Sequence, residues 1–544
     1  MPVDTQTPGS PGWWLKRLGD RLIARRPRYE ALDLYFRGEQ AVPALSGKAT
    51  RQAFRDLMQM ARMNYAELVI EAVQERMTPA GFRTGSEGDE LEDREAWRMW
   101  QENYLDADSG LVHRASLSMG DAYVIVGADP DVPEGAPVRP LITPEDPREV
   151  ITEEDPRRRR KTLAGLKMYR DASGDDVAYV YLPGRVYRFR ADGSSPLSAT
   201  VNGDREPVSV ISAEGWSPDG VLELPAALRT EVPCVPFRNN PTLFNVGRGE
   251  FEPHLGLLDR ISFTVLQRLE VATLQAFRQR AIKGVEPRDE DGNKIDYSNI
   301  FDYSPGSLWL LPETAELWES QQVDLTPIRA AVKDDVQDLA AVTRTPLFYL
   351  TPEANNGSAE GASLAREGLV FKVTDRIKQA GQSWEQVMSL AFLLKGDTTR
   401  GNRADMEVIW ASPERFSLAE RYDAAVKAGA AGVPWRTVMT DILQFTPQQV
   451  DRMEAERAAD ALLSGAAAEE EMPERARPPA PASPDDDAAG SMRERFDALG
   501  VAVRAGVDPA DAAARVGLPG VRFTGAVPTS LRLPEEDAAD LEET

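Results

Sequence analysis

The sequence predicts an α+β protein that contains unusually long helices. In residues 251–280, apolar side chains recur every three or four positions, the spacing of one helical face. Residues 326–345 and 359–394 show the same spacing, whereas residues 1–250 mix helical segments with short strand-like runs. We therefore expect an N-terminal part of helices around an antiparallel sheet, followed by a largely helical remainder.

The first 250 residues alternate between the two patterns. Helical spacing covers residues 51–77, where Asn64 lies either within the helix or at a break. Two shorter helices are predicted at residues 90–103 and 111–119. Strand-like runs separated by turn residues occupy residues 123–126, 163–169, 177–182 and 185–189.

The helix predicted over residues 251–280 is long for a globular protein. No proline or glycine interrupts residues 257–283. Thirty helical residues span about 45 Å at 1.5 Å per residue, whereas the average globular helix has about 11–12 residues. A solitary domain rarely needs so long a rod, but a wall built from many copies does.

Residues 281–325 read as a small β-containing insertion. Residues 283–294 are charged and rich in turn signals, including Asp291-Gly292, and residues 307–312 form a short apolar, strand-like run. Such a hairpin beside an aromatic strand can add strands across a subunit interface. An ordinary insertion between two helices fits the same pattern, so both interpretations stay open.

The next helix, residues 326–345, is expected to begin at Thr326-Pro327, a capping hydroxyl followed by proline at the first helical position. It should end before Pro346, which disfavours the helical conformation in the preceding residue. Residues 346–358 contain prolines and Asn-Asn-Gly, so we expect a loop without regular structure. Ser358 then caps a third helix. A helical hairpin with a surface lid also fits this pattern.

The C-terminal part is predicted to be helical and then irregular. Residues 411–465 are alanine-rich, with cap signals at Ser417 and Thr446. Residues 466–544 combine a Pro- and Asp-rich linker, disordered by composition, with a small helical module and an acidic tail. We assign no function to this last segment.

Several motifs occur in an order that resembles a known family. Asn239-Asn-Pro241 is followed by Gly247-Arg-Gly-Glu250 and the long helix. Further matching runs are Tyr35–Gly38, Asn64-Tyr65, Glu75–Met77, Gly81-Phe82, Thr343–Leu350 and Asn355–Glu360. Together they resemble the portal proteins of long-tailed double-stranded DNA phages, in the branch typical of phages of Gram-positive hosts. The resemblance covers roughly residues 30 to 460.

The resemblance implies a subunit of a ring, usually of twelve copies, at one capsid vertex. A mixed wing corresponds to residues 1–250, and a two-helix stem to residues 251–280 and 326–345. A β-containing clip corresponds to residues 281–325 and a tunnel loop to residues 346–358. Residues 359–410, the channel helix and the return to the wing, precede a helical crown at residues 411–465.

The resemblance also implies partners. The ring would be assembled in the host cytoplasm and reside in the virion, with the major capsid and scaffolding proteins around it. The clip would bind the large terminase subunit during packaging, and head-completion or adaptor proteins afterwards. The clip residues expected to contact these partners are Arg288, Asp289, Glu290, Lys294 and Trp309. The residues expected to meet passing double-stranded DNA, without sequence specificity, are Asn355, Asn356, Gly357, Ser358, Lys372 and Arg376.

The composition bears on several function classes. The formal net charge of −25 argues against a protein that grips DNA by bulk attraction, but an acidic channel wall lets DNA slide. The same charge also simply favours solubility.

The only dense basic run, Arg157–Lys161, is interpreted as a solvated loop paired with the acids of residues 153–155 rather than as a DNA or localisation patch. Lys372 and Arg376, four positions apart, fit either contacts to DNA phosphates in a channel or ordinary exposed side chains on the helix surface.

An enzyme is disfavoured. The sequence lacks a phosphate-binding Gly-x-x-x-x-Gly-Lys-Ser/Thr loop, and its two histidines, His113 and His254, lie in unrelated segments. We expect no catalytic residue, metal or cofactor. The single cysteine, Cys234, lies in an apolar stretch and is expected to be a buried thiol in a reducing compartment.

The sequence suggests no membrane partner. It contains no run of 18 apolar residues and no signal-peptide pattern at its start, and the basic amphipathic segment 13–23 is expected to dock within the protein. Two other function classes stay open: a helical scaffold or adaptor of the virion that forms no ring, and a nuclease-like enzyme with divergent motifs.

Overall fold

A computed structural model describes most of the first 459 residues. The described ranges are 3–41, 52–86, 93–133, 135–191, 215–244, 246–276, 280–284, 316–319, 323–351, 359–414, 418–445, 449–459 and residue 513. The chain divides into two compact units, Met1–Ala455 and Glu456–Thr544, and nearly all described residues belong to the first. Helices and antiparallel strands are both present, which confirms the predicted α+β class.

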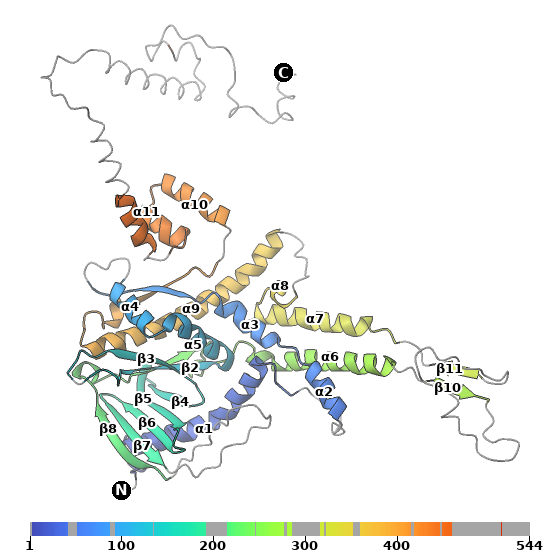
Figure 1. The fold of residues 1–544 in the computed structure, drawn as a ribbon, viewed down its shortest axis with the longest axis horizontal. Helices are drawn as coiled ribbons and strands as arrows, with labels where there is room; N and C mark the ends of the chain where they lie inside the picture. Colours follow the sequence, from blue (N-terminus) through green and yellow to red (C-terminus); the bar gives the residue numbers. More distant parts are fainter. Residues whose placement is uncertain are drawn as a thin grey trace. The chain divides into compact units, whose positions relative to one another are not determined.

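A five-stranded antiparallel sheet forms one layer of the first unit (Figure 1). Its strands, in spatial order, are β4 (Val150–Asp155), β5 (Arg158–Arg170), β6 (Asp176–Leu182), β7 (Arg185–Ala191) and β8 (Ser217–Glu223). Three of these strands match predicted runs. The sequence analysis missed β4 and β8, because β4 is acidic and β8 is exposed along its whole length.

Helix α1 (Pro11–Phe36) packs on this sheet. Leu15, Leu18 and Leu22 are buried in one core with Ile151 and Leu166 of the sheet. The side chain of Ser10 caps the helix by accepting a hydrogen bond from the Trp13 backbone N–H at 3.1 Å. The apolar face of residues 13–23 is therefore part of the interior. Among the described residues, no helix is both long and apolar enough to cross a bilayer.

A second, three-stranded sheet has the order β3-β2-β9. Its strands are β2 (Asp121–Ala128), β3 (Pro140–Glu145) and β9 (Cys234–Arg238), and the helices α4 (Arg94–Glu102), α5 (Leu105–Met119) and α9 (Ala359–Lys395) contribute to the same core. Trp100 and Trp384 meet edge to face in that core with ring centroids 4.7 Å apart. Cys234 is fully buried beside it, as predicted, and burial raises the pKa of its thiol.

The helix predicted over residues 51–77 is two helices. Helix α2 (Gln52–Met60) ends before Asn64, and α3 (Tyr65–Gln74) begins after it. The Asn64 side chain accepts a hydrogen bond from the Glu67 backbone N–H at 3.3 Å, so the residue marks a helix start. After α3, strand β1 (Pro79–Arg83) pairs with β12 (Glu407–Trp410), which lies in the C-terminal part of the unit's sequence.

Helices α6 (Leu255–Ala276) and α7 (Thr326–Thr343) lie side by side and antiparallel, away from both sheets (Figure 1). Leu258 and Ile261 of α6 share a core with Val336 and Leu339 of α7. With 22 residues, α6 is about 33 Å long, shorter than predicted because strand β10 begins at Arg280. This strand, β10 (Arg280–Lys283), pairs antiparallel with β11 (Glu316–Glu319).

Two details of the loop predictions around α7 are wrong. Thr326 is the first helical residue and not its cap, and the Asp324 carboxylate instead accepts the Thr326 backbone N–H at 2.9 Å. Residues 347–350, expected to be irregular, form a short helix, α8 (Leu347–Leu350), whose last residue is buried. Its apolar side chains pack into the core, which outweighs the flanking prolines. The predicted helix after residue 358 is present as α9, 37 residues long.

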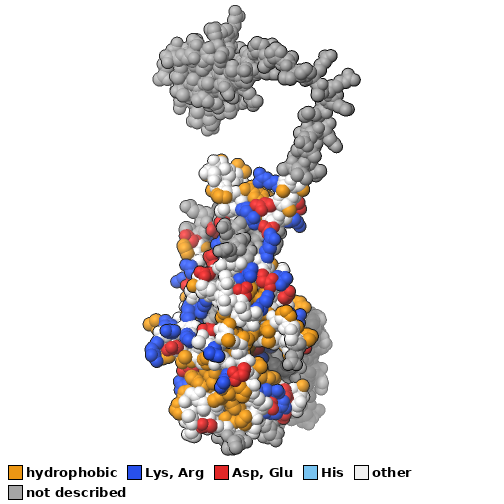
Figure 2. Space-filling view, turned by 90° about the vertical axis from the view of Figure 1, so that its left-hand side faces the viewer, with side chains coloured by type: hydrophobic (Ala, Val, Ile, Leu, Met, Phe, Trp, Pro, Cys, Tyr) orange, Lys and Arg blue, Asp and Glu red, His pale blue; other side chains and the backbone are white. Residues whose placement is uncertain are grey.

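The segment after residue 410 is mostly helical where it is described. It contains α10 (Leu418–Ala430), a short α11 (Trp435–Thr437), a π-helical turn (Val438–Ile442) and a helical run over residues 449–459. The predicted caps at Ser417 and Thr446 lie outside the described residues. Figure 2 shows acidic and basic side chains interspersed over one face of the molecule and hydrophobic side chains gathered toward its lower end.

Candidate functional site: a buried junction at the base of two long helices

The segment between β9 and α6 is held by backbone contacts to the turn between α5 and β2. Asn239 donates its backbone N–H to the Gly120 carbonyl at 2.9 Å, and Glu250 donates to the Leu117 carbonyl at 2.8 Å. The Arg248 N–H closes the segment on itself by donating to the Asn239 carbonyl at 2.8 Å. The described residues of the segment 239–250, which leave out Asn245, therefore form a compact loop shortly before α6.

Two glycines in this loop allow the close approach. A Cβ on Gly247 would lie 1.9 Å from the Gly120 carbonyl oxygen, and one on Gly249 would lie 2.3 Å from that of Ser118. No side chain fits at such distances, so the two backbones meet only because these positions are glycine. This is the physical reason for the Gly-Arg-Gly spacing noted in the sequence.

Glu250 is the centre of a buried ion-pair cluster. Its carboxylate accepts hydrogen bonds from Arg376 Nε at 2.6 Å and from Asn239 Nδ2 at 2.9 Å, and it pairs with Lys372 Nζ at 2.9 Å. Lys372 Nζ also donates to the carbonyl of Thr343, the last residue of α7, at 2.9 Å. The cluster thus joins the segment before α6 to the end of α7 and to α9.

The electrostatics of this cluster favour the ionised carboxylate. Burial by itself would raise the pKa of Glu250, but Lys372 and Arg376 outweigh it and lower that pKa to about 2. The Glu250 side chain is only 6% exposed and that of Lys372 only 5%. In such surroundings, removing one partner of an ion pair costs about 3–5 kcal/mol, because the remaining charge stays buried and unpaired.

A second group of polar contacts fixes α1 to the same loop. Arg28 donates to both carboxylate oxygens of Glu252 at 2.7 Å and to the Gly247 carbonyl at 2.9 Å. Asp121, almost fully buried, accepts the Tyr29 hydroxyl at 2.8 Å. The loop is therefore held by α1, the α5–β2 turn and α9 together.

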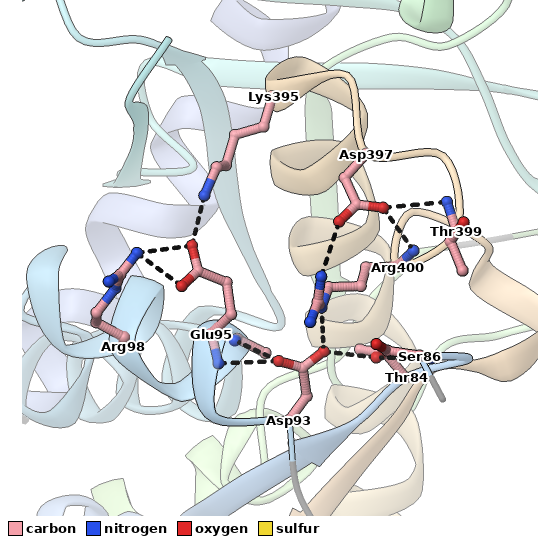
Figure 3. A network of polar contacts seen from close by, with 10 residues as sticks. Thr84, Ser86, Asp93, Glu95, Arg98, Lys395, Asp397, Thr399 and Arg400 are labelled. Carbon is pink, nitrogen blue, oxygen red and sulfur yellow. Dashed lines mark hydrogen bonds and ion pairs between the residues drawn. The ribbon is translucent and has the colours of Figure 1, made fainter. Parts of the chain in front are cut away.

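A further network holds the C-terminal end of α9 (Figure 3). The fully buried Asp93 caps α4 by accepting the N–H groups of Glu95 at 2.9 Å and Ala96 at 3.0 Å. It also accepts Arg400 Nε at 2.8 Å, and Lys395 donates to Glu95. Helix α9 is therefore held at its C-terminal end as well as in its middle, where Lys372 and Arg376 meet Glu250.

Every charged group at the centre of the cluster is occupied by a partner. Within the described part of the chain, no group of three His, Cys, Asp or Glu residues is placed to hold a metal ion. His254 lines a hollow of about 360 Å³ beside the cluster, together with Arg344 and Phe371. Burial lowers its pKa, so it stays neutral near pH 7.

The structure places only two of the predicted site residues. Lys372 and Arg376 lie together, as their spacing implied, but their side chains are buried against Glu250. Their predicted contact with DNA stays a prediction, whereas their role in the junction is seen directly. The remaining predicted residues, Asn355, Asn356, Gly357, Ser358, Arg288, Asp289, Glu290, Lys294 and Trp309, lie outside the described residues.

The sequence analysis did not single out Glu250, Asn239 or Asp121 as site residues. A signal was available for two of them. Asn239 opens the Asn-Asn-Pro motif and Glu250 closes the Gly-Arg-Gly-Glu motif that carried the family resemblance. A carboxylate directly before a long helix and an asparagine after a buried strand are positions where buried polar contacts are common. Asp121 offered no comparable signal.

The family model described as "Phage portal protein, SPP1 Gp6-like" matches residues 15–461. The chain belongs to this family. It is 29% identical over 378 residues to the portal protein of Mycobacterium phage D29, covering 68% of this chain and 72% of that protein. It is 27% identical over 384 residues to the portal protein of Mycobacterium phage L5, covering 69% and 74%.

Among solved structures, the neck of a native GTA particle computed with C12 symmetry is similar with a TM-score of 0.36 and 12% identity, covering 77% of this chain and 99% of that one. The family match confirms the resemblance drawn from the motifs. Portal proteins are structural, non-enzymatic proteins of the phage head. The chain is thus a portal-family protein of the virion capsid.

Proposed function

We propose that this portal-family chain assembles into a ring of about twelve copies at one capsid vertex and forms the channel through which terminase packages the genome and the genome later leaves. The observation that carries the proposal is the family match over residues 15–461. The antiparallel pair α6–α7 adds to it, because two rods per subunit placed side by side around an axis enclose a channel.

The parts of the ring follow from the chain order. Residues 1–250 form the wing, 251–280 and 326–345 the stem, 281–325 the clip, 346–358 the tunnel loop, 359–410 the channel helix with its return, and 411–465 the crown. The strand pair β10–β11 supports a clip that extends between the stem helices. The 56% exposure of Trp318 on β11 supports a clip that meets another protein, terminase during packaging and head-completion proteins afterwards.

The junction around Glu250 gives the channel its mechanical base. Force on the stem from moving DNA passes along α6 and α7 into the loop of residues 239–250 and the end of α7. Both are connected to α9 by Lys372 and Arg376. A buried ion-pair cluster resists shear because any displacement separates charges in a low-dielectric interior.

The tunnel loop is the proposed contact with passing DNA. Its residues Asn355, Asn356, Gly357 and Ser358 come after the short helix α8 at the start of the loop, whose Leu350 is buried, and before α9, which is held in its middle and at its C-terminal end. A loop between two fixed helices can reach into a lumen without loosening its base. Its neutral polar side chains offer hydrogen bonds but no strong attraction to phosphate, which suits a DNA duplex that must slide past them.

The functional test is deletion of residues 355–358 in a phage that depends on this chain. We expect capsids to assemble normally and the amount of retained DNA to fall. Replacing the four residues by a Gly-Ser segment of equal length is the matched control, and it separates loop length from side-chain contacts. Full DNA content and yield with the deletion would refute the role of the loop.

A further inference from the structure

The basic run Arg157–Lys161 does not form the self-paired loop expected from the sequence. Residues 158–161 begin strand β5. Of the three nearby acids, Glu153 pairs with Arg17 and Arg21 of α1, Glu154 pairs with Arg238 of β9, and Asp155 accepts the backbone N–H of Arg157 at 2.8 Å. Within the described part of the chain, the structure records no ion pair for Arg158, Arg160 or Lys161. Glu385 attracts Arg160 without forming an ion pair with it, so the positive charge of the run is not neutralised within the chain and can meet another molecule.

The cations lie close enough together to repel one another. Burial lowers the pKa of Arg160, and the neighbouring charges of Arg403 and Arg159 lower it further. Four of the five basic residues of the run, Arg158 to Lys161, line a hollow of about 640 Å³ together with Arg403, Leu390 and Leu393 of α9 and a single acid, Glu231. An anionic group entering this hollow would relieve the repulsion.

Two exposed apolar side chains stand beside the basic run. Arg159 Nη2 donates to the Thr242 carbonyl at 2.9 Å, which places the loop of residues 242–244 next to the start of β5. Leu243 is 84% exposed and Phe244 is 90% exposed. Large apolar side chains this exposed, next to arginines, have the composition that marks protein–protein contacts.

We propose that the basic–apolar face, made of Arg158, Arg159, Arg160, Lys161, Leu243 and Phe244, is a contact surface for a second copy of this chain. The inference rests on the proposed ring. A second copy carries a formal net charge of −25, so its surface offers acidic partners for these cations. Duplex DNA would also satisfy the arginines, but phosphate binding leaves Leu243 and Phe244 without a function.

The charge of the face also determines the geometry of the contact. Two such faces placed against each other would bring eight cations together, so a two-fold contact of the face with itself is disfavoured. The face must instead meet a different, acidic surface of the neighbour. That is a heterologous contact, the kind that closes into a ring when the rotation between copies allows it.

Photo-crosslinking tests the partner directly. Phe244 is replaced by p-benzoylphenylalanine in the full chain, and copies carrying a light and a heavy isotopic label are mixed and allowed to assemble. The purified assembly is then irradiated, and the crosslinked peptides are identified by mass spectrometry. We expect crosslinks that join a light and a heavy copy at an acidic segment. Crosslinks confined to one copy would overturn the inference.

Assembly measurements test the two halves of the face. We expect Phe244→Ser, and the pair Arg158→Glu with Arg160→Glu, each to raise the concentration at half-assembly at least about tenfold. The matched controls are Val221→Ser and Leu222→Ser on β8, which are also highly exposed at 59% and 61%. Equal effects in the controls would overturn the inference.

Two further outcomes are decisive. If the charge-reversed variant assembles normally but binds a duplex DNA probe more weakly than the unaltered chain, the face is a DNA contact and the inference fails while the ring survives. If the unaltered chain never assembles, the proposed ring itself fails. The two failures are therefore distinguishable.

Discussion

At the scale of single residues, the polar contacts of the junction converge on Glu250, because a lysine, an arginine and an asparagine all bind its carboxylate. Glu250→Gln keeps the shape but leaves the buried Lys372 without its carboxylate partner, and Arg376 paired only with the exposed Asp375. We expect a loss of about 3–5 kcal/mol in the free energy of unfolding, measured by urea denaturation. Glu102→Gln, which removes an exposed partner of Arg98, should cost less than about 1 kcal/mol. Equal losses in both variants would contradict the role of the cluster.

The same residue predicts a pH dependence. The pKa of Glu250 is about 2 in the folded protein against an ordinary value of 4.5, so the unfolded chain binds more protons at acidic pH. The stability from this carboxylate is present above 4.5 and is lost as the pH falls toward 2. We expect the stability difference between the unaltered chain and Glu250→Gln to shrink over that range. A difference independent of pH would show that another group controls the cluster.

Gly247 allows a sharp test of the backbone contact. Gly247→Ala places a methyl group 1.9 Å from the Gly120 oxygen, so one of the two backbones must move. Overpacking of this kind costs about 1–3 kcal/mol or more. The matched control is Gly256→Ala in α6, where the new Cβ meets nothing within 4 Å and helix propensity predicts a gain of about 0.5–1 kcal/mol. Thermal unfolding of both variants gives the comparison, and a stable Gly247→Ala protein would refute the close approach.

At this scale, the sequence pointed to Lys372 and Arg376 but not to Glu250, the residue that they bind. Lys372 and Arg376 stood out because they lie four positions apart on one helical face. Nothing local shows that Glu250, 126 positions before Arg376, folds against them. Short motifs are visible in a sequence, whereas the pairing of distant charges depends on the tertiary fold.

At the scale of elements, long periodic segments were predictable and short ones were not. Helix α9 was found at nearly its full length because its apolar spacing persists over 37 residues. The break at Asn64 was one of two alternatives, because one capping side chain leaves no periodic signal, and the short helix α8 was missed, because four residues are too few to show a period. Helix α6 ended earlier than its apolar pattern, because strand pairing of β10 with β11 takes over at Arg280.

The stem assignment makes a prediction about α6. Val265→Pro removes a backbone donor and introduces a clash in the middle of the helix, which costs about 3 kcal/mol or more. Because Val265 is buried in contact with the core that includes Val332 of α7, the helix pair should separate and ring assembly should fail. Val265→Ala is the control for lost side-chain volume, and it should assemble. Native mass measurements distinguish the two, and normal assembly of Val265→Pro would contradict the assignment.

At the scale of the whole molecule, the proposed channel subunit combines an acidic chain, the antiparallel helices α6 and α7, and the junction around Glu250 at their base. In the proposed channel, the net charge of −25 would keep DNA from adhering to the wall, and the basic–apolar face would supply the local attraction that acidic copies need in order to assemble. We expect assembly to weaken as ionic strength rises toward 1 M, because salt screens partly exposed charge pairs. Light scattering across a salt series checks this, and stronger assembly at high salt would indicate a purely apolar contact.

The most direct test of the central claim is electron microscopy of the purified full-length chain viewed end-on. The account predicts closed rings of identical subunits around a central hole wide enough for duplex DNA, with α6 and α7 around the channel. Single-copy particles at every concentration and salt tested, together with their presence as single copies in virions, would contradict it.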